Sequence, residues 1–412
     1  MADVLGDLRA AAGGHAGEAT EADAVAGMPA RWVARPGSTD ETSAVLRAAA
    51  AHDLTVVPRG SGTKLGWGAP PESADLVLDT TGLDALVEHA AGDLICVVGA
   101  GRSLDTLASD LAPAGQRLGV DPARRGTVGG AVATATTGPN RLHHGAVRDQ
   151  VIGMTLVRAD GVVAHAGGKV VKNVAGYDLG KLLTGSFGTL GVITQVAFRL
   201  HPVPEAQRWV SVPVSSADGI QELVLALVHS QVVPSALELD WHGGEGTLSL
   251  LLEGIPPGVE GRTAQVLGLL GSGAGESVEP PAWWGSEPES ATGALLKVSH
   301  EIAGLSRLLA ALESVAAAVG ITPRFRGSPG VGTALVGLDG EGTPEALAQF
   351  VDELRRSSPA FGGSVVLLEA PAGLRDGVDP WGPVTALSLM RSVKQQFDPE
   401  RRLAPGRFVG GI

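Results

Sequence analysis

The spacing of apolar and polar positions along the chain predicts strands that alternate with helices. Short apolar runs predict strands at Leu54–Pro58, Leu76–Asp79, Leu94–Val98, Leu156–Asp160 and Val192–Leu200. Ser38 precedes Glu41 with the spacing of a capping box, so we expect a helix that ends near His52. This alternation is typical of an α/β or α+β layer architecture.

A second cycle of the same kind follows the sequence HPVPE at residues 201–205, where two prolines interrupt the chain. Its predicted strands are Trp209–Val214, Leu237–Asp240 and Leu248–Leu252, and its predicted helices are Ile220–Val228, Thr263–Leu270 and Leu305–Val319. With 412 residues, the chain is long enough for at least two domains. We therefore predict a leader at 1–28, a first domain at 29–204, a second domain at 205–385 and a C-terminal segment at 386–412.

Composition and charge limit the classes of protein that fit. Hydrophobic residues make up 44% of the chain and charged residues 18%, which is typical of a globular protein. The net charge of −13 disfavours nucleic acid as a partner, because phosphate binding needs a basic surface. Cys96 is the only cysteine and lies in an apolar run, so we interpret it as a buried hydrophobe. A disulfide, a zinc cluster and a cysteine-ligated iron–sulfur cluster are excluded within this chain.

No membrane or export signal is evident in the pattern. The N-terminus lacks a basic stretch followed by an apolar one, so we expect no signal peptide. No run approaches the ~18 consecutive apolar residues of a spanning helix, so we expect none.

The segment 58–64 (PRGSGTK) directly follows a predicted strand. Its glycines allow successive backbone N–H groups to turn toward one point, which is how an anion-binding nest forms. Ser61 and Thr63 add hydroxyl donors. Arg59 and Lys64 add positive charge. The segment is therefore a candidate diphosphate cradle, and a glycine-rich surface turn remains the alternative.

A run of small residues from Gly126 to Gly138 follows Asp121. Thirteen small or β-branched residues cannot fill a core by themselves. They suit a place where another backbone or a flat ligand approaches closely. A small-residue helix packed tightly on a sheet explains the pattern equally well.

Further segments complete a set that resembles a known family. They are residues 144–153, 170–179 (VVKNVAGYDL), 185–194 (GSFGTLGVIT) and the tail 397–408 with its FDP and PGRF sequences. Over about residues 29–204, the chain resembles the FAD-binding domain of the vanillyl-alcohol oxidase/p-cresol methylhydroxylase (PCMH) superfamily. Within it, the chain looks most like the FAD-binding E subunits of bacterial glycolate oxidases. The resemblance implies an α+β fold: a two-subdomain PCMH-type FAD-binding domain, an α/β cap domain and a C-terminal segment that returns to the FAD domain.

The resemblance also implies which residues hold the cofactor. Residues 58–64 would surround the FAD pyrophosphate, and residues 121–134 would line the approach of the ADP-ribose and the flavin. The full set of candidate cofactor-binding residues is Pro58, Arg59, Gly60, Ser61, Gly62, Thr63, Lys64, Asp121, Thr127, Val128, Gly129, Gly130, Thr134, Gly138, Gly145, Val192, Ile193 and Arg407. Lys172, Asn173 and Tyr177 would lie near the cofactor or the domain junction.

The function that the resemblance implies is that of an FAD-binding subunit of a glycolate (2-hydroxy acid) oxidase or dehydrogenase complex, with flavin-mediated hydride or electron transfer. Its partners would be a sister FAD-binding catalytic subunit and a separate iron–sulfur subunit. The chain would be cytoplasmic, or peripheral at the inner face of the membrane through the complex. One alternative is a self-sufficient FAD-dependent 2-hydroxy-acid or alcohol oxidoreductase. A second is a structural subunit without flavin, against which the intact glycine positions argue.

Departures from the family pattern refine these expectations. Many relatives carry a flavin-linked histidine in the glycine-rich loop, but Gly62-Thr63-Lys64 offers none, so we expect non-covalent FAD. Ala404 replaces the asparagine of the usual NPGR tail. Related 2-hydroxy-acid dehydrogenases carry the metal-linked sequence HxGDGNxH, whereas residues 242–246 (HGGEG) lack the second histidine. We interpret 242–246 as a hairpin turn and predict no metal site. Independent oxidation of a hydroxy acid is then less expected, and no catalytic residue is assigned.

Other polar and aromatic features carry open alternatives. The pair His143-His144 is a candidate for contact with flavin or a partner, not for a metal site. Arg324 and Arg326 share one face of a predicted strand, which could bind a carboxylate, although we favour a solvated face. Trp283-Trp284 could form a subunit contact or pack on its own domain.

Overall fold

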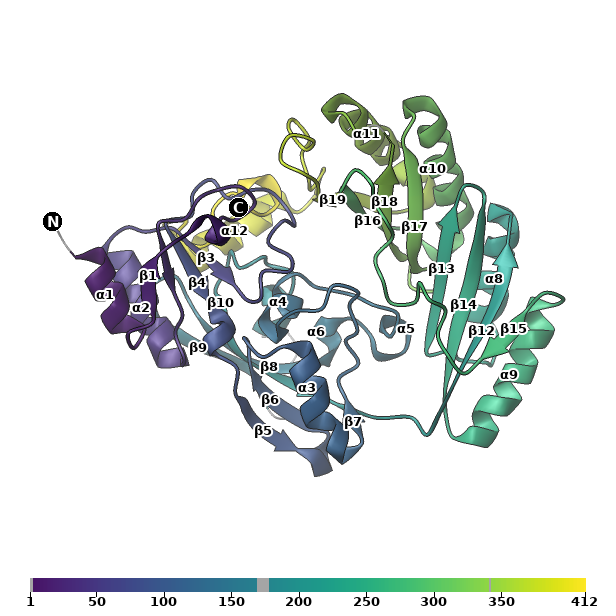
Figure 1. Ribbon diagram of the computed structural model, residues 1–412, viewed down its shortest axis with the longest axis horizontal. Helices are drawn as coiled ribbons and strands as arrows, with labels where there is room; N and C mark the ends of the chain where they lie inside the picture. The colour runs from purple at the N-terminus through teal and green to yellow at the C-terminus, as the bar shows by residue number, and fades with distance from the viewer. Residues whose placement is uncertain (1–2, 169–177, 341) are drawn as a thin grey trace.

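The computed structural model describes residues 3–168, 178–340 and 342–412. Figure 1 shows two lobes, one formed by the first half of the chain with its C-terminal end, the other by the segment between them. The mixture of helices with several separate sheets confirms the α+β fold. The predicted boundaries at 204/205 and 385/386 fall between β11 and β12 and shortly before α12. We call residues 205–385 the cap domain.

The first sheet is formed near the start of the chain. Its described strands lie in the order β1 (Ala16–Glu18), β2 (Trp32–Ala34), β4 (Leu76–Asp79) and β3 (Val56–Arg59), with β4 parallel to both β2 and β3. Helix α2 (Thr39–Ala51) packs on it, and its first turn is capped by Ser38, which accepts a hydrogen bond from the Glu41 amide at 3.1 Å. The carboxylate of Glu41 accepts from Gly37 instead of closing the capping box on Ser38.

Residues 3–28 are integrated into this layer and do not form a separate leader. Helix α1 (Val4–Ala11) packs on α2, where Leu8 and Ala12 are fully buried beside Val45 and Leu46. β1 then pairs antiparallel with β2. Of the two interpretations that the Ala-, Gly- and acid-rich composition allows, a short helix or a loose leader, the structure shows the short helix.

The second sheet is antiparallel. In the described part of the chain its strands lie in the order β5 (Leu86–Ala90), β6 (Ile95–Gly99), β10 (Val192–Arg199), β8 (Val151–Val157) and β9 (Val163–Gly167). Its associated helices are α3 (Leu104–Leu111), α4 (Val128–Ala133), α5 (Arg141–His144), α6 (Val147–Gln150) and α7 (Leu179–Leu183). A short pair of strands, β7 (Gln116–Arg117) and β11 (His201–Pro202), leads to the cap domain. Cys96 is fully buried in β6, which confirms its interpretation as a hydrophobe.

The cap domain contains the third sheet, whose described strands lie in the order β15 (Gly275–Ser277), β12 (Ala206–Val214), β14 (Glu245–Gly254), β13 (Ala236–His242), β17 (Thr322–Ser328), β18 (Thr333–Asp339), β16 (Leu295–Ser299) and β19 (Ser364–Glu369). Its helices are α8 (Ala217–Val228), α9 (Pro256–Leu270), α10 (Leu305–Val319) and α11 (Pro344–Phe361). Figure 1 shows these helices on the side of the sheet that faces away from the first lobe. The opposite face is thus turned toward the first domain.

Several details of the cap domain bear on the sequence predictions. His242 pairs with Glu245 across a tight turn between β13 and β14, so the hairpin interpretation is confirmed. Trp284 packs against Trp209 of its own domain, with ring centroids 6.3 Å apart.

One helical segment of the cap domain, Ile302–Val319, is long and apolar enough to cross a membrane. The search for long runs of consecutive apolar residues did not detect it, because polar residues interrupt the segment. Its leucines are buried in the cap core, so we assign it as a core helix.

The C-terminal segment returns to the first sheet. After α12 (Leu387–Phe397), the backbone of residues 402–404 runs beside β3, where the Val56 amide donates to Arg402 O and the Ala404 amide donates to Val56 O, both at 2.8 Å. Lys394 fixes this path, because its buried ammonium donates to Asp398 (2.7 Å), Thr189 O (2.8 Å) and Leu403 O (2.9 Å). The tail thereby reaches the loop that follows β3.

Candidate cofactor site

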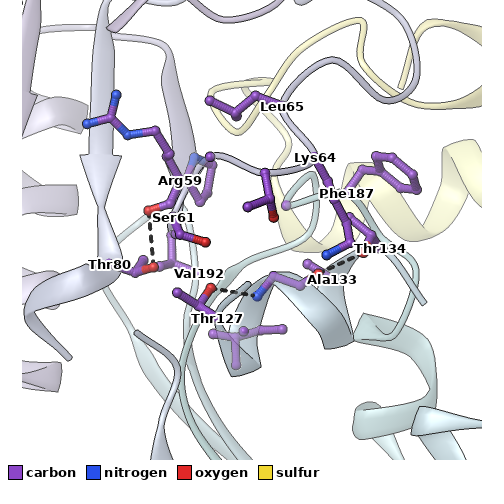
Figure 2. Close-up of a pocket in the computed structure, with 18 of the residues that line it drawn as sticks. Arg59, Ser61, Lys64, Leu65, Thr80, Thr127, Ala133, Thr134, Phe187 and Val192 are labelled. Atoms are coloured by element: carbon purple, nitrogen blue, oxygen red, sulfur yellow. Dashed lines mark hydrogen bonds between the residues drawn. The ribbon is translucent and has the colours of Figure 1, made fainter. Parts of the chain in front are cut away.

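A pocket lies where three segments of the first domain meet the C-terminal tail. It has about 750 Å³ of space between the lining atoms, a volume that includes open solvent. Its lining comes from the loop after β3, from α4, from the turn before β10 and from the tail, as Figure 2 shows in part. The sequence-predicted residues that line it are Pro58, Arg59, Gly60, Ser61, Gly62, Thr63, Lys64, Thr127, Gly129, Gly130, Thr134, Val192, Ile193 and Arg407.

The loop after β3 directs three polar side chains to one place. A Cβ built on Gly126 would lie 2.6 Å from Thr63 Oγ1, 3.1 Å from Ser61 Oγ and 3.7 Å from Lys64 Nζ, so these atoms converge beside that glycine. Gly62 has a φ of +78°, a conformation that glycine adopts without strain. Burial, and then the charge of Arg124, lowers the pKa of Lys64 to about 8, so the ammonium is still mostly charged at neutral pH. The loop therefore presents one cation and two hydroxyls to the pocket.

Arg59 does not add the free positive charge that we expected of it. Its guanidinium donates to Asp23 at 2.8 Å and to Asp79 at 3.2 Å. In Figure 2 it points away from the labelled side chains around the cavity. The two aspartates are remote in sequence, which is why the local pattern overstated the charge of the loop.

The run of small residues at 126–138 fits both interpretations that its sequence allowed: close approach of a ligand and tight packing of a helix on a sheet. Thr127 caps α4 by accepting from the Gly130 amide at 3.3 Å, and one face of the helix lines the pocket. Gly129 lines the pocket and also packs closely, since a Cβ on it would lie 2.8 Å from that of Ala100. Val128 is fully buried in the core and does not line the pocket, so its role toward the cofactor stays a prediction.

Asp121, Gly138 and Gly145 lie away from this pocket. They line a neighbouring cavity, because the chain turns back after α4 and brings Gly138 against the backbone of Asp121. Asp121 accepts hydrogen bonds from the Asn140 amide, and burial raises its pKa to about 7. Their role toward the cofactor stays a prediction.

Arg407 is the buried cation of the tail. Its side chain is 3% exposed, and Nη2 donates to Leu65 O (3.0 Å) and Trp67 O (2.8 Å). Its Nη1 is buried with no partner among the described residues, although Arg407 lines the pocket. Burial, and secondarily the charge of Arg375, lowers its pKa to about 10, so the group stays charged. An unpaired buried donor in a residue that lines the same pocket as these hydroxyls and the ammonium fits an anionic group such as a diphosphate.

Some lining residues were not assigned from the sequence. They are Leu65, Thr80, Ala133, Phe187, Gly188 and Gly191. Phe187 and Gly188 belong to the GSFGTLG segment, whose conformation (φ of +55° and +77°) supplies the turn before β10. Thr80 follows β4, and only the parallel pairing of β3 with β4 brings it to the loop, so no local signal could have indicated it. Lys172, Asn173 and Tyr177 lie outside the described residues.

A separate cavity lies between the first domain and the cap sheet. Thr137, Gly138 and Pro139 form one wall, and residues of β13, β16, β17 and β18 form the other, including Lys297 and Arg326. Burial, and then the charge of Arg141, lowers the pKa of Lys297, which has no ion pair among the residues that the structure describes. The Thr137 hydroxyl is also buried there without a described partner.

Other polar groups near this cavity are already paired. Arg326 donates to Asp240 (2.8 Å), Ser286 Oγ (2.6 Å) and Glu287 O (2.8 Å), so it is not the solvated residue that we favoured. Arg324 pairs with Asp339 and is more exposed. Glu238 accepts from Ser328, and burial raises its pKa to about 8.

The two histidines of α5 lie near the domain junction. The rings of His144 and His201 have centroids 4.0 Å apart, and Arg117 lies 3.3 Å from His144 Nε2. Burial, then neighbouring positive charge, lowers the pKa of His144 to about 3. Neither histidine lines the pocket beneath the 58–64 loop.

Comparison with known proteins identifies the cofactor of the chain. Residues 30–167 match the family model described as an FAD binding domain. The cofactor is FAD. The converging donors beside Gly126 and the unpaired Nη1 of Arg407 fit its diphosphate, and the bound flavin would supply the redox chemistry.

Three curated relatives are similar to this chain. Glycolate oxidase subunit GlcD of Bacillus subtilis is 34% identical over 217 residues, covering 51% of this chain and 45% of the relative. Glycolate oxidase subunit GlcE of Escherichia coli is 33% identical over 211 residues, covering 48% and 59%. The probable mitochondrial D-lactate dehydrogenase of Danio rerio is 25% identical over 429 residues, covering 92% and 84%. The match thus spans about half the length of the two bacterial relatives.

A solved structure of alkyldihydroxyacetonephosphate synthase has the same fold. Its TM-score is 0.69 at 17% identity, over 92% of this chain and 76% of that one. The shared arrangement includes the cap domain, so the likeness supports the α+β two-domain architecture.

Proposed function

We propose that the protein is an FAD-dependent oxidoreductase that acts on a small 2-hydroxy acid. The observation that carries this proposal is Lys297, a partly buried cation without a described counter-ion that lines the cavity between the FAD-binding domain and the cap sheet. A substrate carboxylate would provide that counter-ion, and the Thr137 hydroxyl could donate a further hydrogen bond to it. The names of the bacterial and fish relatives, which include glycolate oxidase subunits and a D-lactate dehydrogenase, agree with a hydroxy-acid substrate.

The protein could carry out this activity either as a subunit of a complex or as a single chain. In the first, the chain is an FAD-binding subunit that works beside a sister flavoprotein and a separate iron–sulfur subunit, at the inner face of the membrane or in the cytoplasm. The match to GlcE favours it. In the second, the chain turns over by itself, which the long match to the fish dehydrogenase favours. The chain's single cysteine means that any cysteine-ligated cluster belongs to a partner.

The test is the visible spectrum of the purified protein before and after glycolate or D-lactate is added without oxygen. A flavin band that bleaches would support turnover by the chain alone. A band that bleaches only when partner subunits are present would support the subunit arrangement. If the band never bleaches with any small 2-hydroxy acid in either preparation, the proposal is wrong. Denaturation should release the FAD, since we predict no covalent link.

A matched pair of variants tests the role of Lys297. Lys297→Met should keep the flavin band and raise the KM for the hydroxy acid by about ten- to a hundredfold, because a charge-assisted hydrogen bond is lost. Arg324→Gln alters a more exposed cation of the same sheet and should leave the KM unchanged.

A further inference from the structure

The loop after β3 contacts both the FAD pocket and the cap domain. Its first part, residues 58–64, lines the pocket. Its second part turns to the cap, where Trp67 is 6% exposed and packs against Leu295 and Leu368. The Gly68 amide donates to Leu368 O at 2.8 Å. One short segment therefore spans from the cofactor to the cap sheet.

Arg124 forms a second connection between the same two regions. Its Nε and Nη2 donate to the two oxygens of Glu287 at 3.1 and 2.7 Å, and its Nη1 donates to Glu369 at 2.6 Å. Glu287 lies in the segment before β16, and Glu369 ends β19, so both carboxylates belong to the cap domain. A bidentate pair between a guanidinium and a carboxylate, such as Arg124 with Glu287, fixes the orientation of the two groups as well as their distance.

Arg124 also holds the pocket-lining part of the loop. Its backbone carbonyl accepts a hydrogen bond from Lys64 Nζ at 2.6 Å, and its Nη1 donates to Thr63 O at 3.2 Å. Its guanidinium carbon lies 5.7 Å from the centre of the Trp67 ring. Neither Arg124 nor its two cap carboxylates line the FAD pocket. Any effect of these residues on FAD must therefore act through Thr63 and Lys64.

We propose that Arg124 is a positioning residue that couples FAD binding to docking of the cap domain. Glu287 and Glu369 hold the guanidinium, and Arg124 in turn holds Thr63 and Lys64 in the arrangement that receives the diphosphate. Linkage requires that FAD stabilises the docked cap by the same factor by which the docked cap tightens FAD binding. The proposal rests on FAD as the ligand of the pocket and is independent of the substrate.

The charges make the coupling distinguishable from simple packing. Burial is the main cause that lowers the pKa of Lys64, the charge of Arg124 lowers it further, and Glu287 raises it. Neutralising Glu287 would leave the repulsion between Arg124 and Lys64 less compensated. Lys64 would then lose its proton at a lower pH.

The first test uses the holoprotein and the variant Glu287→Gln/Glu369→Gln. FAD release into buffer is followed by the fluorescence of the free flavin between pH 6 and 10. We expect release at least about fivefold faster than in the wild type, with its acceleration at high pH shifted to lower pH. Glu289→Gln is the matched control, since Glu289 lies in the same segment but its side chain is 83% exposed and pairs with Arg324 at 3.8 Å, not with Arg124.

The second test measures the reciprocal effect by limited proteolysis of the exposed segment 271–286 with and without FAD. FAD should slow cleavage in the wild type and in Glu289→Gln, and should slow it much less in the double variant. If the double variant fails to fold, Glu369→Gln alone provides the same comparison. The proposal is overturned if the folded variant releases FAD at the wild-type rate at every pH. It is also overturned if FAD does not change the rate at which the wild type is cleaved.

Discussion

At the scale of single residues, we predict that Lys64 makes cofactor binding depend on pH. Its pKa is lowered from 10.5 to about 8 by burial and by Arg124, so the ammonium is charged below that pH and neutral above it. We expect the affinity of the free protein for FAD to fall as the pH rises through about 8. Titration of the apoprotein with FAD at pH 7 and pH 9.5 measures this change.

Variants of Lys64 distinguish the effect of its charge on FAD affinity from the effect of its side-chain shape. Lys64→Met should bind FAD about ten- to a hundredfold more weakly at pH 7 and lose the pH dependence. Lys64→Arg keeps its charge over the whole range and should also lose the dependence. A wild-type affinity that stays constant from pH 7 to 9.5 would contradict this role.

Residue types and spacing predicted much of the pocket, but only where the contacts are local. The 58–64 loop, Thr127 and Thr134 line it as expected. Arg59 differs because Asp23 and Asp79 neutralise it, and these arrive through the packing of separate elements. Val128 is buried in the core instead of lining the pocket, because a helix has two faces and the run of small residues did not indicate which face would be exposed to the pocket.

At the scale of elements, capping and apolar spacing predicted where most helices lie, although α9 begins at Pro256 and not at the predicted Thr263. Helix α10 has the predicted bounds, and α2 begins at the predicted cap. Most strand ends lie within about three residues of the prediction, but β8 begins at Val151 and not at Leu156. The order of the strands in the sheets depends on pairing between distant segments. The parallel contact of β3 with β4 and the return of the tail beside β3 have no local signature in the sequence.

The C-terminal element depends on one buried ion pair. Lys394 and Asp398 have side chains that are 5% and 1% exposed, and Asp398 also accepts from the amides of Arg402 and Leu403. Lys394→Met would leave a buried carboxylate without its cation. We expect a loss of about 3 kcal/mol in the free energy of unfolding, measured by chemical denaturation.

A matched control lies in the same segment. Arg401 pairs with Glu72 at the surface, where the side chains are 50% and 57% exposed. Arg401→Gln should therefore cost less than about 1 kcal/mol. Equal losses for the two variants would mean that burial of the Lys394 pair is not what anchors the tail.

At the scale of the whole molecule, a buried carboxyl group makes stability depend on pH. Burial raises the pKa of Glu238 to about 8, with a smaller contribution from Asp121. A raised pKa in the folded state means that this stability is complete below the unfolded pKa of about 4.5 and is lost as the pH rises through about 8. We expect the free energy of unfolding to fall between pH 5.5 and 8.5.

Glu238→Gln should reduce this slope. The amide cannot ionise and can still accept a hydrogen bond from Ser328, so the variant should be more stable than the wild type at pH 8.5, by on the order of 2 kcal/mol. Glu245→Gln, at the exposed turn between β13 and β14, should keep the wild-type slope. A wild-type slope in Glu238→Gln would show that other groups dominate.

The position of Arg407 in the chain has a consequence for the order of assembly. The FAD pocket is lined by residues from Pro58 to Arg407, so its last wall is also among the last parts to be synthesised. A ribosome-bound chain that has not reached residue 407 lacks the cation that we expect to bind the diphosphate. We therefore expect prematurely terminated products to lack flavin and to be colourless.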